Sequence, residues 1–330
     1  MIRDTGLDLI RSIAIFFVIG GHFFLMNTSL REVPFQGTSL FIQATVLSLF
    51  FSGVPLFVML TGYLNINKSC SWKYYKNIGR VLYPYIVISL ITILFRKYYL
   101  HETLLWSEWL LKVLDFSAIP YGWYIEMWIG LYLLTPFLNI LYKNIEKKES
   151  KLILICVLFA ITIFPHWVNR DGMHLLPGFW KQCWPLAFYF SGAYIQEFQP
   201  VVSKKIAFLF IGCICLLNPV LNLLLHTHSL LFLGGGPEDI CSFFVTLLLF
   251  LLCYQIKINS EVLKKSIMKI SLCSLDMYLC CYIFDALYYP IFKKAFFVSQ
   301  EQFGIYFFVI VPLVFISSLL VSFLRKMFVK

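Results

Sequence analysis

The chain has 330 residues, of which 60% are hydrophobic, 18% are aromatic and only 13% are charged, and its formal net charge is +10. Soluble domains carry about 25% charged residues, so this composition excludes an ordinary soluble fold. Apolar runs recur at about twenty residues, the length that crosses the roughly 30 Å hydrocarbon core of a bilayer. We therefore predict an all-α polytopic membrane protein with one integral-membrane domain over residues 1–330.

About ten membrane spans are expected, at 7–27, 40–64, 79–97, 123–142, 152–168, 182–198, 205–225, 240–257, 270–289 and 304–324. Positive residues fall between these spans, so we interpret them as determinants of topology rather than as contacts to nucleic acid. With a cytoplasmic N-terminus, 18 of the 27 Lys and Arg residues lie in cytoplasmic loops, 8 lie outside and Arg11 is within the first span. This bias predicts that the N-terminus and the C-terminus are both cytoplasmic. The segment 98–122 has Trp and Leu at helical spacing, which indicates an interfacial or re-entrant piece.

The first span, from Gly6 to Phe24, carries Asp8, Arg11 and His22 inside an apolar run. Eleven residues advance a helix by about three turns, so Arg11 and His22 share one face about 16 Å apart, with Asp8 one turn below Arg11. An ionisable group in hydrocarbon costs about 3 kcal/mol even on permissive scales, so this face must meet protein or water. In a catalytic interpretation, His22 is a general base, Arg11 orients an anionic group and Asp8 holds Arg11. In a structural one, Arg11 and Asp8 form a buried pair and His22 bonds to a carbonyl.

Three basic residues, Lys73, Lys76 and Arg80, lie at the cytoplasmic approach to the third span at intervals of three to four residues. On a continuous helix this spacing places them on one side. Such a group can hold the phosphates of a nucleotide-like donor, for which Arg offers a bidentate fork. A positive anchor beside anionic lipid explains the same residues equally well.

The fourth span begins with aromatic residues, Trp123 among them, as is typical of a membrane interface. Glu126 lies just inside this span and is a candidate for lining a polar cavity. In the second span, Gly53 and Gly62 permit the close approach of another helix, and Pro55 frees a backbone carbonyl. Plain helix packing is the simpler interpretation of these three residues.

Taken in order, these segments resemble the membrane-bound acyltransferase 3 family. The resemblance rests on GLDLIRSIAIFFVIGGHFF, GVPLFVMLTGYL, the basic stretch ending in RVLYPY, WYIEMWIGLYLLTPFLN, and the segment Ser274-Leu-Asp-Met-Tyr-Leu-Cys-Cys281. The last segment is similar to the Ser-x-x-x-Tyr-Leu sequence of the family. The resemblance covers nearly the whole chain, and the length fits members that lack an extracytoplasmic esterase-like domain.

The resemblance implies transfer of an acyl group, most often acetyl, from cytoplasmic acyl-CoA to a hydroxyl of a cell-envelope glycan or its lipid-linked precursor. It implies that Arg11 and His22 are the essential pair, supported by Asp8. It also implies that Arg80, with Lys76 and Lys73, helps to bind the donor.

Further expectations concern the substrates and the location of the protein. We assign Trp123 and Glu126 to substrate binding. The expected partners are acyl-CoA, the glycan or lipid-linked acceptor and membrane lipid, with no nucleic acid and no metal. The expected location is a cell membrane, as a multi-pass protein of the bacterial cytoplasmic membrane.

One position departs from the family pattern: many members carry a His after Tyr-Leu in the ninth span, where this chain has Cys280 and Cys281. The ten cysteines show no CxxC pair and no Cys/His ligand spacing, so we interpret them as small residues of the membrane core. Asp276 and Asp285 in the same span are further site candidates, with packing as the simpler interpretation.

Two functions other than acyl transfer stay open. A polysaccharide or lipid transporter should show paired broken helices in two matching halves, and we find none in the sequence. A non-catalytic membrane partner of a glycan synthase would tolerate the substitution His22→Ala.

Overall fold

The structure is a computed structural model, which describes residues 4–28, 30, 33, 35–169, 174–224 and 235–328. Within these ranges the chain is helical and contains no strand. The helices are α1 (Thr5–Leu25), α2 (Gly37–Phe50), α3 (Gly53–Asn65), α4 (Trp72–Lys76), α5 (Gly79–Tyr98), α6 (Trp106–Leu114), α7 (Trp123–Lys143), α8 (Lys148–Leu158), α9 (Phe164–Val168), α10 (Pro185–Phe198), α11 (Lys204–Leu224), α12 (Ile240–Cys253), α13 (Glu261–Phe296), α14 (Gln300–Phe303) and α15 (Phe307–Phe328).

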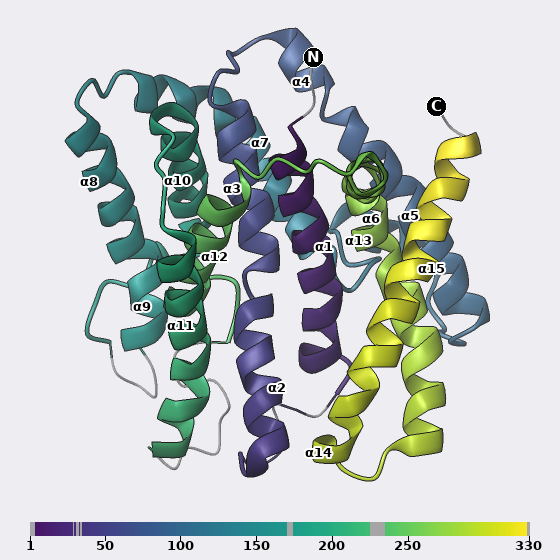
Figure 1. Cartoon of the computed structure of the whole chain (residues 1–330). Coiled ribbons are helices and arrows are strands. Elements are labelled where there is room, and N and C mark those ends of the chain that lie inside the picture. The colour runs from purple at the N-terminus through teal and green to yellow at the C-terminus, as the bar shows by residue number, and fades with distance from the viewer. Residues whose placement is uncertain are drawn as a thin grey trace.

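Eight helical segments among the described residues are long and apolar enough to cross a membrane. The remaining two predicted spans, 182–198 and 240–257, correspond to α10 and α12, which have only 14 residues each. Successive long helices run in alternating directions through one bundle, and α1 begins at the end where α15 finishes (Figure 1). The prediction of an all-α polytopic membrane protein is confirmed. Which side of the membrane this end faces stays a prediction.

The short helix α10 is buried because it packs closely against α3. A methyl group added at Gly62 would collide with the backbone carbonyl of Tyr189, and one added at Gly192 would collide with that of Met59. At Gly53, an added carbon would lie 3.0 Å from the carbonyl oxygen of Ala14 on α1. The close helix approach predicted at Gly53 and Gly62 is therefore confirmed, and it locks α3 between α1 and α10.

Prolines within the helices free carbonyls that other helices then use. Pro55 has no N–H to bond the carbonyl four residues earlier, and this carbonyl, of Phe51, accepts a hydrogen bond from Ser242 Oγ at 3.2 Å. Pro136 likewise frees the carbonyl of Tyr132, which accepts a hydrogen bond from the Tyr74 hydroxyl at 2.9 Å. The first bond joins α12 to the break between α2 and α3, and the second joins α4 to α7.

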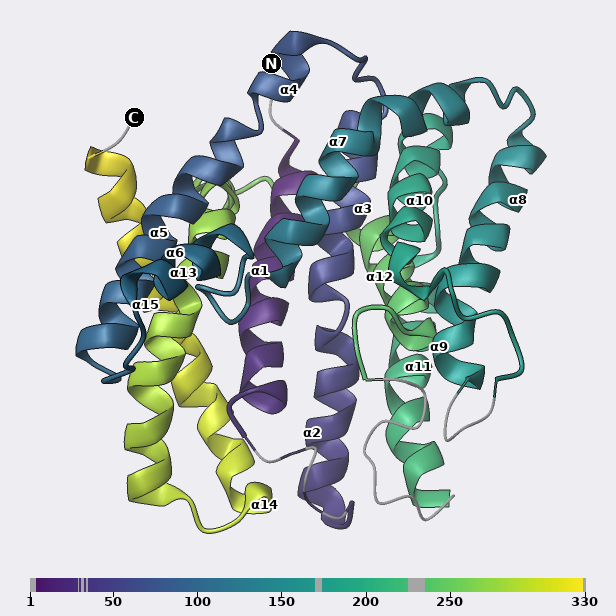
Figure 2. The ribbon, with the colours of Figure 1, turned by 180° about the vertical axis from the view of Figure 1, so that it is seen from behind.

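The segment between α5 and α7 folds back against the bundle (Figure 2), and whether it is interfacial or re-entrant stays a prediction. Trp109 of α6 is only 1% exposed and packs with Ile93 and Ala118. Arg96 holds the loop, because its guanidinium bonds the Glu102 carboxylate at 2.8 Å and the carbonyl of Ala118 at 3.0 Å. The segment thereby brings its last residues, just before α7, into the bundle beside the end of α1.

Gly62→Ala is expected to lower the free energy of unfolding by about 1–3 kcal/mol, because the new methyl group meets backbone that cannot rotate away. Gly212→Ala on α11 is the matched control, since an added carbon there has nothing within 4 Å. The control is expected to be neutral or to stabilise by up to about 1 kcal/mol, as Ala favours helix over Gly. The measurement is thermal unfolding of both purified variants in detergent, and equal shifts of the midpoint would contradict the packing described.

Candidate active site

The polar residues of α1 meet a polar stripe on α13. The stripe consists of Ser271, Ser274, Tyr278, Cys281 and Asp285. Its members are spaced alternately three and four residues apart, which keeps them on one face of the helix. Ionisable and hydroxyl groups within a membrane must be satisfied by protein or water, and at both ends of α1 the stripe supplies polar partners.

At one end of this interface, Asp8 holds Arg11 as the sequence predicts. Asp8 is 4% exposed, and its Oδ1 accepts a hydrogen bond from Ser271 Oγ at 2.6 Å. The same oxygen lies 3.9 Å from Nη1 of Arg11, whose side chain is 31% exposed. Ser12 Oγ adds a bond to the carbonyl of Ile267 at 3.2 Å. The carboxylate is thus fixed by α13, while the guanidinium reaches open space.

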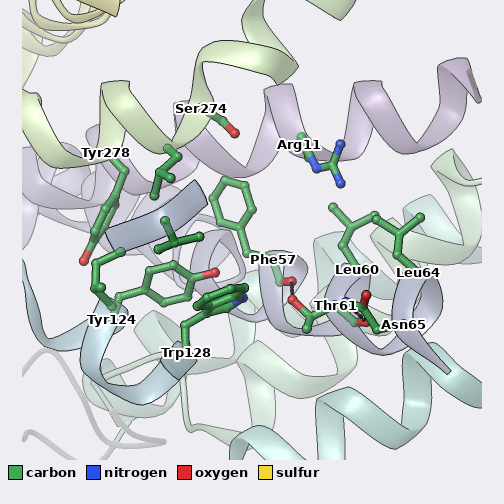
Figure 3. A pocket seen from close by; sticks show the side chains of 13 residues that line it. Arg11, Phe57, Leu60, Thr61, Leu64, Asn65, Tyr124, Trp128, Ser274 and Tyr278 are labelled. Atoms are coloured by element: carbon green, nitrogen blue, oxygen red, sulfur yellow. Dashed lines mark hydrogen bonds between the residues drawn. The ribbon is translucent and has the colours of Figure 1, made fainter. Parts of the chain in front are cut away.

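Arg11 opens onto a cavity of about 220 Å³ between α1, α3, α7 and α13. Its lining includes Arg11, Phe57, Leu60, Thr61, Leu64, Asn65, Val81, Tyr124, Ile125, Trp128, Ser274, Leu275 and Tyr278. Figure 3 shows the Arg11 guanidinium on the side of Leu60 and Leu64, with the rings of Tyr124 and Trp128 gathered away from it. We call this space the Arg11 cavity. It is a largely apolar slot with one cation at its edge.

A second hollow, of about 570 Å³, adjoins the Arg11 cavity and carries the basic residues. Its lining is Asn65, Asn67, Lys68, Ser69, Ser71, Lys73, Tyr74, Asn77, Arg80, Val81, Trp128 and Tyr132. We call it the basic vestibule. It shares Asn65, Val81 and Trp128 with the Arg11 cavity, so the two spaces are neighbours on a common wall.

The walls of the basic vestibule are held by hydrogen bonds and stacked rings. Asn139 of α7 donates from Nδ2 to the carbonyls of Asn65 and Lys68, both at 2.7 Å, which fixes the turn after α3. The rings of Tyr74 and Tyr132 stack with their centroids 4.4 Å apart and an angle of 11° between their planes. The vestibule therefore combines cations and amides with a rigid aromatic support.

Lys76 lies outside this group. Lys73 and Arg80 line the vestibule, whereas Lys76 is exposed and does not. The predicted common side assumes one continuous helix, but α4 ends at Lys76 and α5 begins at Gly79. The intervening turn separates Lys76 from the other two.

At the other end of the α1–α13 interface, His22 meets three side chains. Its ring stacks on that of Tyr121, with 3.7 Å between the centroids and 29° between the planes. Its Nδ1 lies 3.7 Å from Cys281 Sγ and 3.9 Å from Asp285 Oδ2. Only 12% of the His22 side chain is exposed. One nitrogen of the imidazole therefore has both a thiol and a carboxyl group close by.

Asp285 is held on one oxygen only. The Tyr121 hydroxyl donates to Oδ2 at 2.8 Å, and Asn27 Nδ2 reaches the Tyr121 hydroxyl at 3.4 Å. Oδ1 is buried and has no hydrogen-bond partner among the described residues. Because a buried carboxyl oxygen is most stable when it accepts a hydrogen bond, Oδ1 is free to accept one from a bound group.

The ligand atoms of His22, Cys281 and Asp285 all lie within 4.8 Å of one another, so their chemistry would allow a metal ion. Two of these atoms already make other bonds. Cys281 Sγ donates to the carbonyl of Tyr278 at 3.2 Å, and Asp285 Oδ2 accepts from Tyr121. A thiol that coordinates a metal is deprotonated, whereas a thiol that donates to a carbonyl keeps its proton. The bonds present fit a protonated, hydrogen-bonded cluster.

Asp276 and Cys280 lie on the side of α13 that faces α15. Asp276 accepts hydrogen bonds at 2.9 Å from both Ser322 Oγ and Arg325 Nη2. Cys280 Sγ contacts the carbonyl of Ser318 at 3.7 Å. For Asp276, the simpler interpretation of helix packing agrees with these contacts.

Trp123 and Glu126 line a separate hollow of about 470 Å³, together with Gln182 and Trp184 beside the start of α10. On α7 these two residues lie on a different face from Tyr124 and Trp128, which line the Arg11 cavity. The structure therefore brings Trp123 and Glu126 together but places them apart from Arg11.

The family model Acyl_transf_3, described as an acyltransferase domain, matches residues 4–324. The chain belongs to the acyltransferase 3 family. As a member with apolar helices long enough to span a bilayer, it is a multi-pass membrane acyltransferase. This match lends no support to the transporter alternative. No curated protein and no solved structure matches the chain.

The residues that our sequence reasoning missed in this acyltransferase are Tyr121, which it did not single out, and Cys281 and Asp285, for which it favoured packing roles. All three surround His22. The alternating spacing of three and four residues from Ser271 to Asp285 was a usable signal, because it marks one polar face on an apolar helix. Tyr121 left no such signal, since it comes from an irregular segment.

Tyr121→Phe is expected to lower the free energy of unfolding of this acyltransferase by about 1–3 kcal/mol, because Asp285 Oδ2 loses its donor while the ring stack on His22 is kept. Tyr98→Phe, which removes a hydroxyl from a side chain that is 66% exposed, is the control, expected within about 0.5 kcal/mol of wild type. Thermal unfolding in detergent compares the two. A wild-type midpoint for Tyr121→Phe would argue against the Tyr121–Asp285 bond.

Proposed function

We propose that the protein transfers an acetyl or similar acyl group from acyl-CoA to a hydroxyl of a cell-envelope glycan or its lipid-linked precursor, with His22 as the base. The observation that carries this proposal is the shared wall of the basic vestibule and the Arg11 cavity. The shared wall connects the vestibule, which is suited to phosphates, with the apolar Arg11 cavity. Arg11, at the edge of this cavity, lies on the same helix as His22.

The basic vestibule has the chemistry that the nucleotide part of acyl-CoA requires. Arg80, Lys73 and Lys68 supply positive charge for phosphate groups, for which Arg also offers a fork of donors. Trp128, which stacks on the buried Tyr132 with 4.8 Å between the ring centroids and lines the vestibule, offers an aromatic surface for an adenine. The long, narrow pantetheine arm would then enter the Arg11 cavity past Trp128.

His22 has the surroundings of a general base. Nδ1 is the nitrogen near Asp285 and Cys281, and the imidazolium that forms when His22 takes a proton would lie 3.9 Å from the Asp285 carboxylate. A carboxylate beside a catalytic His stabilises its charged form and orients its ring. Stacking on Tyr121 restricts the ring further. Asp8 and Arg11 would help to hold the acyl-CoA donor and would take no part in the proton transfer at His22.

Trp123 and Glu126 remain our proposed contacts for the acceptor. An indole ring and a carboxylate suit a sugar, because the ring packs on its C–H face and the carboxylate accepts its hydroxyl protons. Their hollow lies on α7 between α10 and the face that borders the Arg11 cavity. Acceptor and donor would thus approach α7 from different sides.

The arrangement agrees with the predicted topology. The basic vestibule includes α4, and α4 lies at the end of the bundle where α1 begins and α15 finishes (Figure 1). A cytoplasmic N-terminus would place the vestibule where acyl-CoA is available. We propose the bacterial cytoplasmic membrane as the location, with membrane lipid around the bundle and no part for metal or nucleic acid in the reaction.

Substituting His22 by Ala is expected to reduce acyl transfer by about 10²–10⁴-fold, the contribution of a positioned general base. The assay is transfer of label from radiolabelled acetyl-CoA to glycan in inside-out membrane vesicles, with each variant shown to insert at the wild-type level. A non-catalytic partner of a glycan synthase would leave labelling unchanged. Transfer at the wild-type rate by His22→Ala would therefore rule out the proposed base.

Arg80→Ala is expected to raise KM for acyl-CoA about tenfold or more, because a charge-assisted hydrogen bond to phosphate contributes about 1.5–3 kcal/mol. Lys76→Ala is the matched control: it removes a nearby positive charge that does not line the vestibule, and KM should stay at the wild-type value. The same vesicle assay at varied acetyl-CoA gives both constants. Equal effects of the two substitutions would point to a general attraction by surface charge.

A further inference from the structure

We propose that the Cys281 thiol is a transient acyl carrier, which takes the acyl group from acyl-CoA and passes it to the acceptor hydroxyl. This inference rests on the proposed function and names a covalent site within it. Of the two adjacent cysteines, it is the one that stands next to His22.

The first support is geometric. Of the two adjacent cysteines, only Cys281 turns toward His22, with Sγ 3.7 Å from Nδ1, while Cys280 faces α15. At this distance a thiol and an imidazole nitrogen can exchange a proton, the arrangement that activates a cysteine nucleophile. Cys281 is fully buried, so water does not compete for an acyl group held there.

The second support comes from Asp285, which is independent of the thiol. Its Oδ1 is buried and has no donor among the described residues, although the residue is only 1% exposed. The cluster therefore contains a buried oxygen that can accept a hydrogen bond from a bound group. The hydroxyl of an arriving acceptor would supply one, since His22 Nδ1 lies near the other oxygen, Oδ2.

The chemistry balances without any further reactant. In the first step Sγ of Cys281 bonds to the acyl carbon, the bond from that carbon to the CoA sulfur breaks, and the thiol proton passes through His22 to the CoA sulfur. In the second step the acceptor oxygen bonds to the acyl carbon, the bond to Sγ breaks, and the hydroxyl proton passes through His22 to Sγ. One thioester replaces another, and an oxygen ester and a free thiol result.

A carrier also fits the separation of the two substrate hollows. Arg11 lines one of the two donor hollows, and the hollow with Trp123 and Glu126 shares no lining residue with either of them. A covalent intermediate lets CoA leave before the acceptor engages. The two substrates then need not meet at one point at the same time.

The test uses the purified full-length protein with radiolabelled acetyl-CoA and no acceptor. Wild type should become labelled, neutral hydroxylamine should release the label as expected of a thioester, and peptide mass spectrometry should place it on Cys281. Cys280→Ala is the matched control, since it removes the neighbouring buried thiol, and it should label like wild type. Cys281→Ala should remain unlabelled and transfer acyl to glycan at a rate lower by about 100-fold or more.

Cys281→Ser separates chemistry from packing, because it keeps the size of the side chain. It should either stay unlabelled or hold an oxygen ester that resists hydroxylamine, with transfer to glycan reduced in both cases. Wild-type transfer by Cys281→Ala, or label on a residue other than Cys281, would overturn the carrier. Label on Cys281 with no transfer to any glycan would keep the carrier and overturn the proposed acceptor instead.

Discussion

The contact between α1 and α13 is the constraint on which the rest of the molecule depends. Asp8, Arg11 and His22 lie in a helix that is otherwise apolar, and a bilayer offers them no partners. The facing stripe of α13 supplies a hydroxyl for Asp8 and a thiol and a carboxylate for His22. Because α1 and α13 are far apart in sequence, this pairing draws the two ends of the chain together.

The same pairing sets the two ends of the site. The end at Arg11 opens to the Arg11 cavity, which adjoins the basic vestibule, while the end at His22 is closed by Tyr121. The helical rise separates these ends by about 16 Å, which suits a substrate with a charged head and a distant reactive group. Rigid neighbours keep this distance: α3 is locked by its glycine contacts, and Asn139 fixes the turn after it.

The sequence was sufficient to predict the all-α class, the positions of most spans and the polar face of α1, because these depend on local periodicity. The sequence was less informative where a helix is interrupted or is shorter than its apolar run. The turn between α4 and α5 separates Lys76 from Lys73 and Arg80, and α10 and α12, with 14 residues each, are shorter than the spans predicted for them. Trp123 and Glu126 fell on a face of α7 turned away from Arg11, which neighbouring helices decide and spacing does not.

By itself, the sequence determined that this is a polytopic membrane protein, that Arg11 and His22 share one face, and that the ordered motifs resemble the acyltransferase 3 family. These follow from composition, from the 3.6-residue turn and from residue patterns within single helices. Only the tertiary structure decided that Cys281, Asp285 and Tyr121 gather around His22 and that the basic vestibule adjoins the Arg11 cavity. The physical reason is that helix periodicity specifies which residues share a face, whereas packing between distant helices specifies which faces meet.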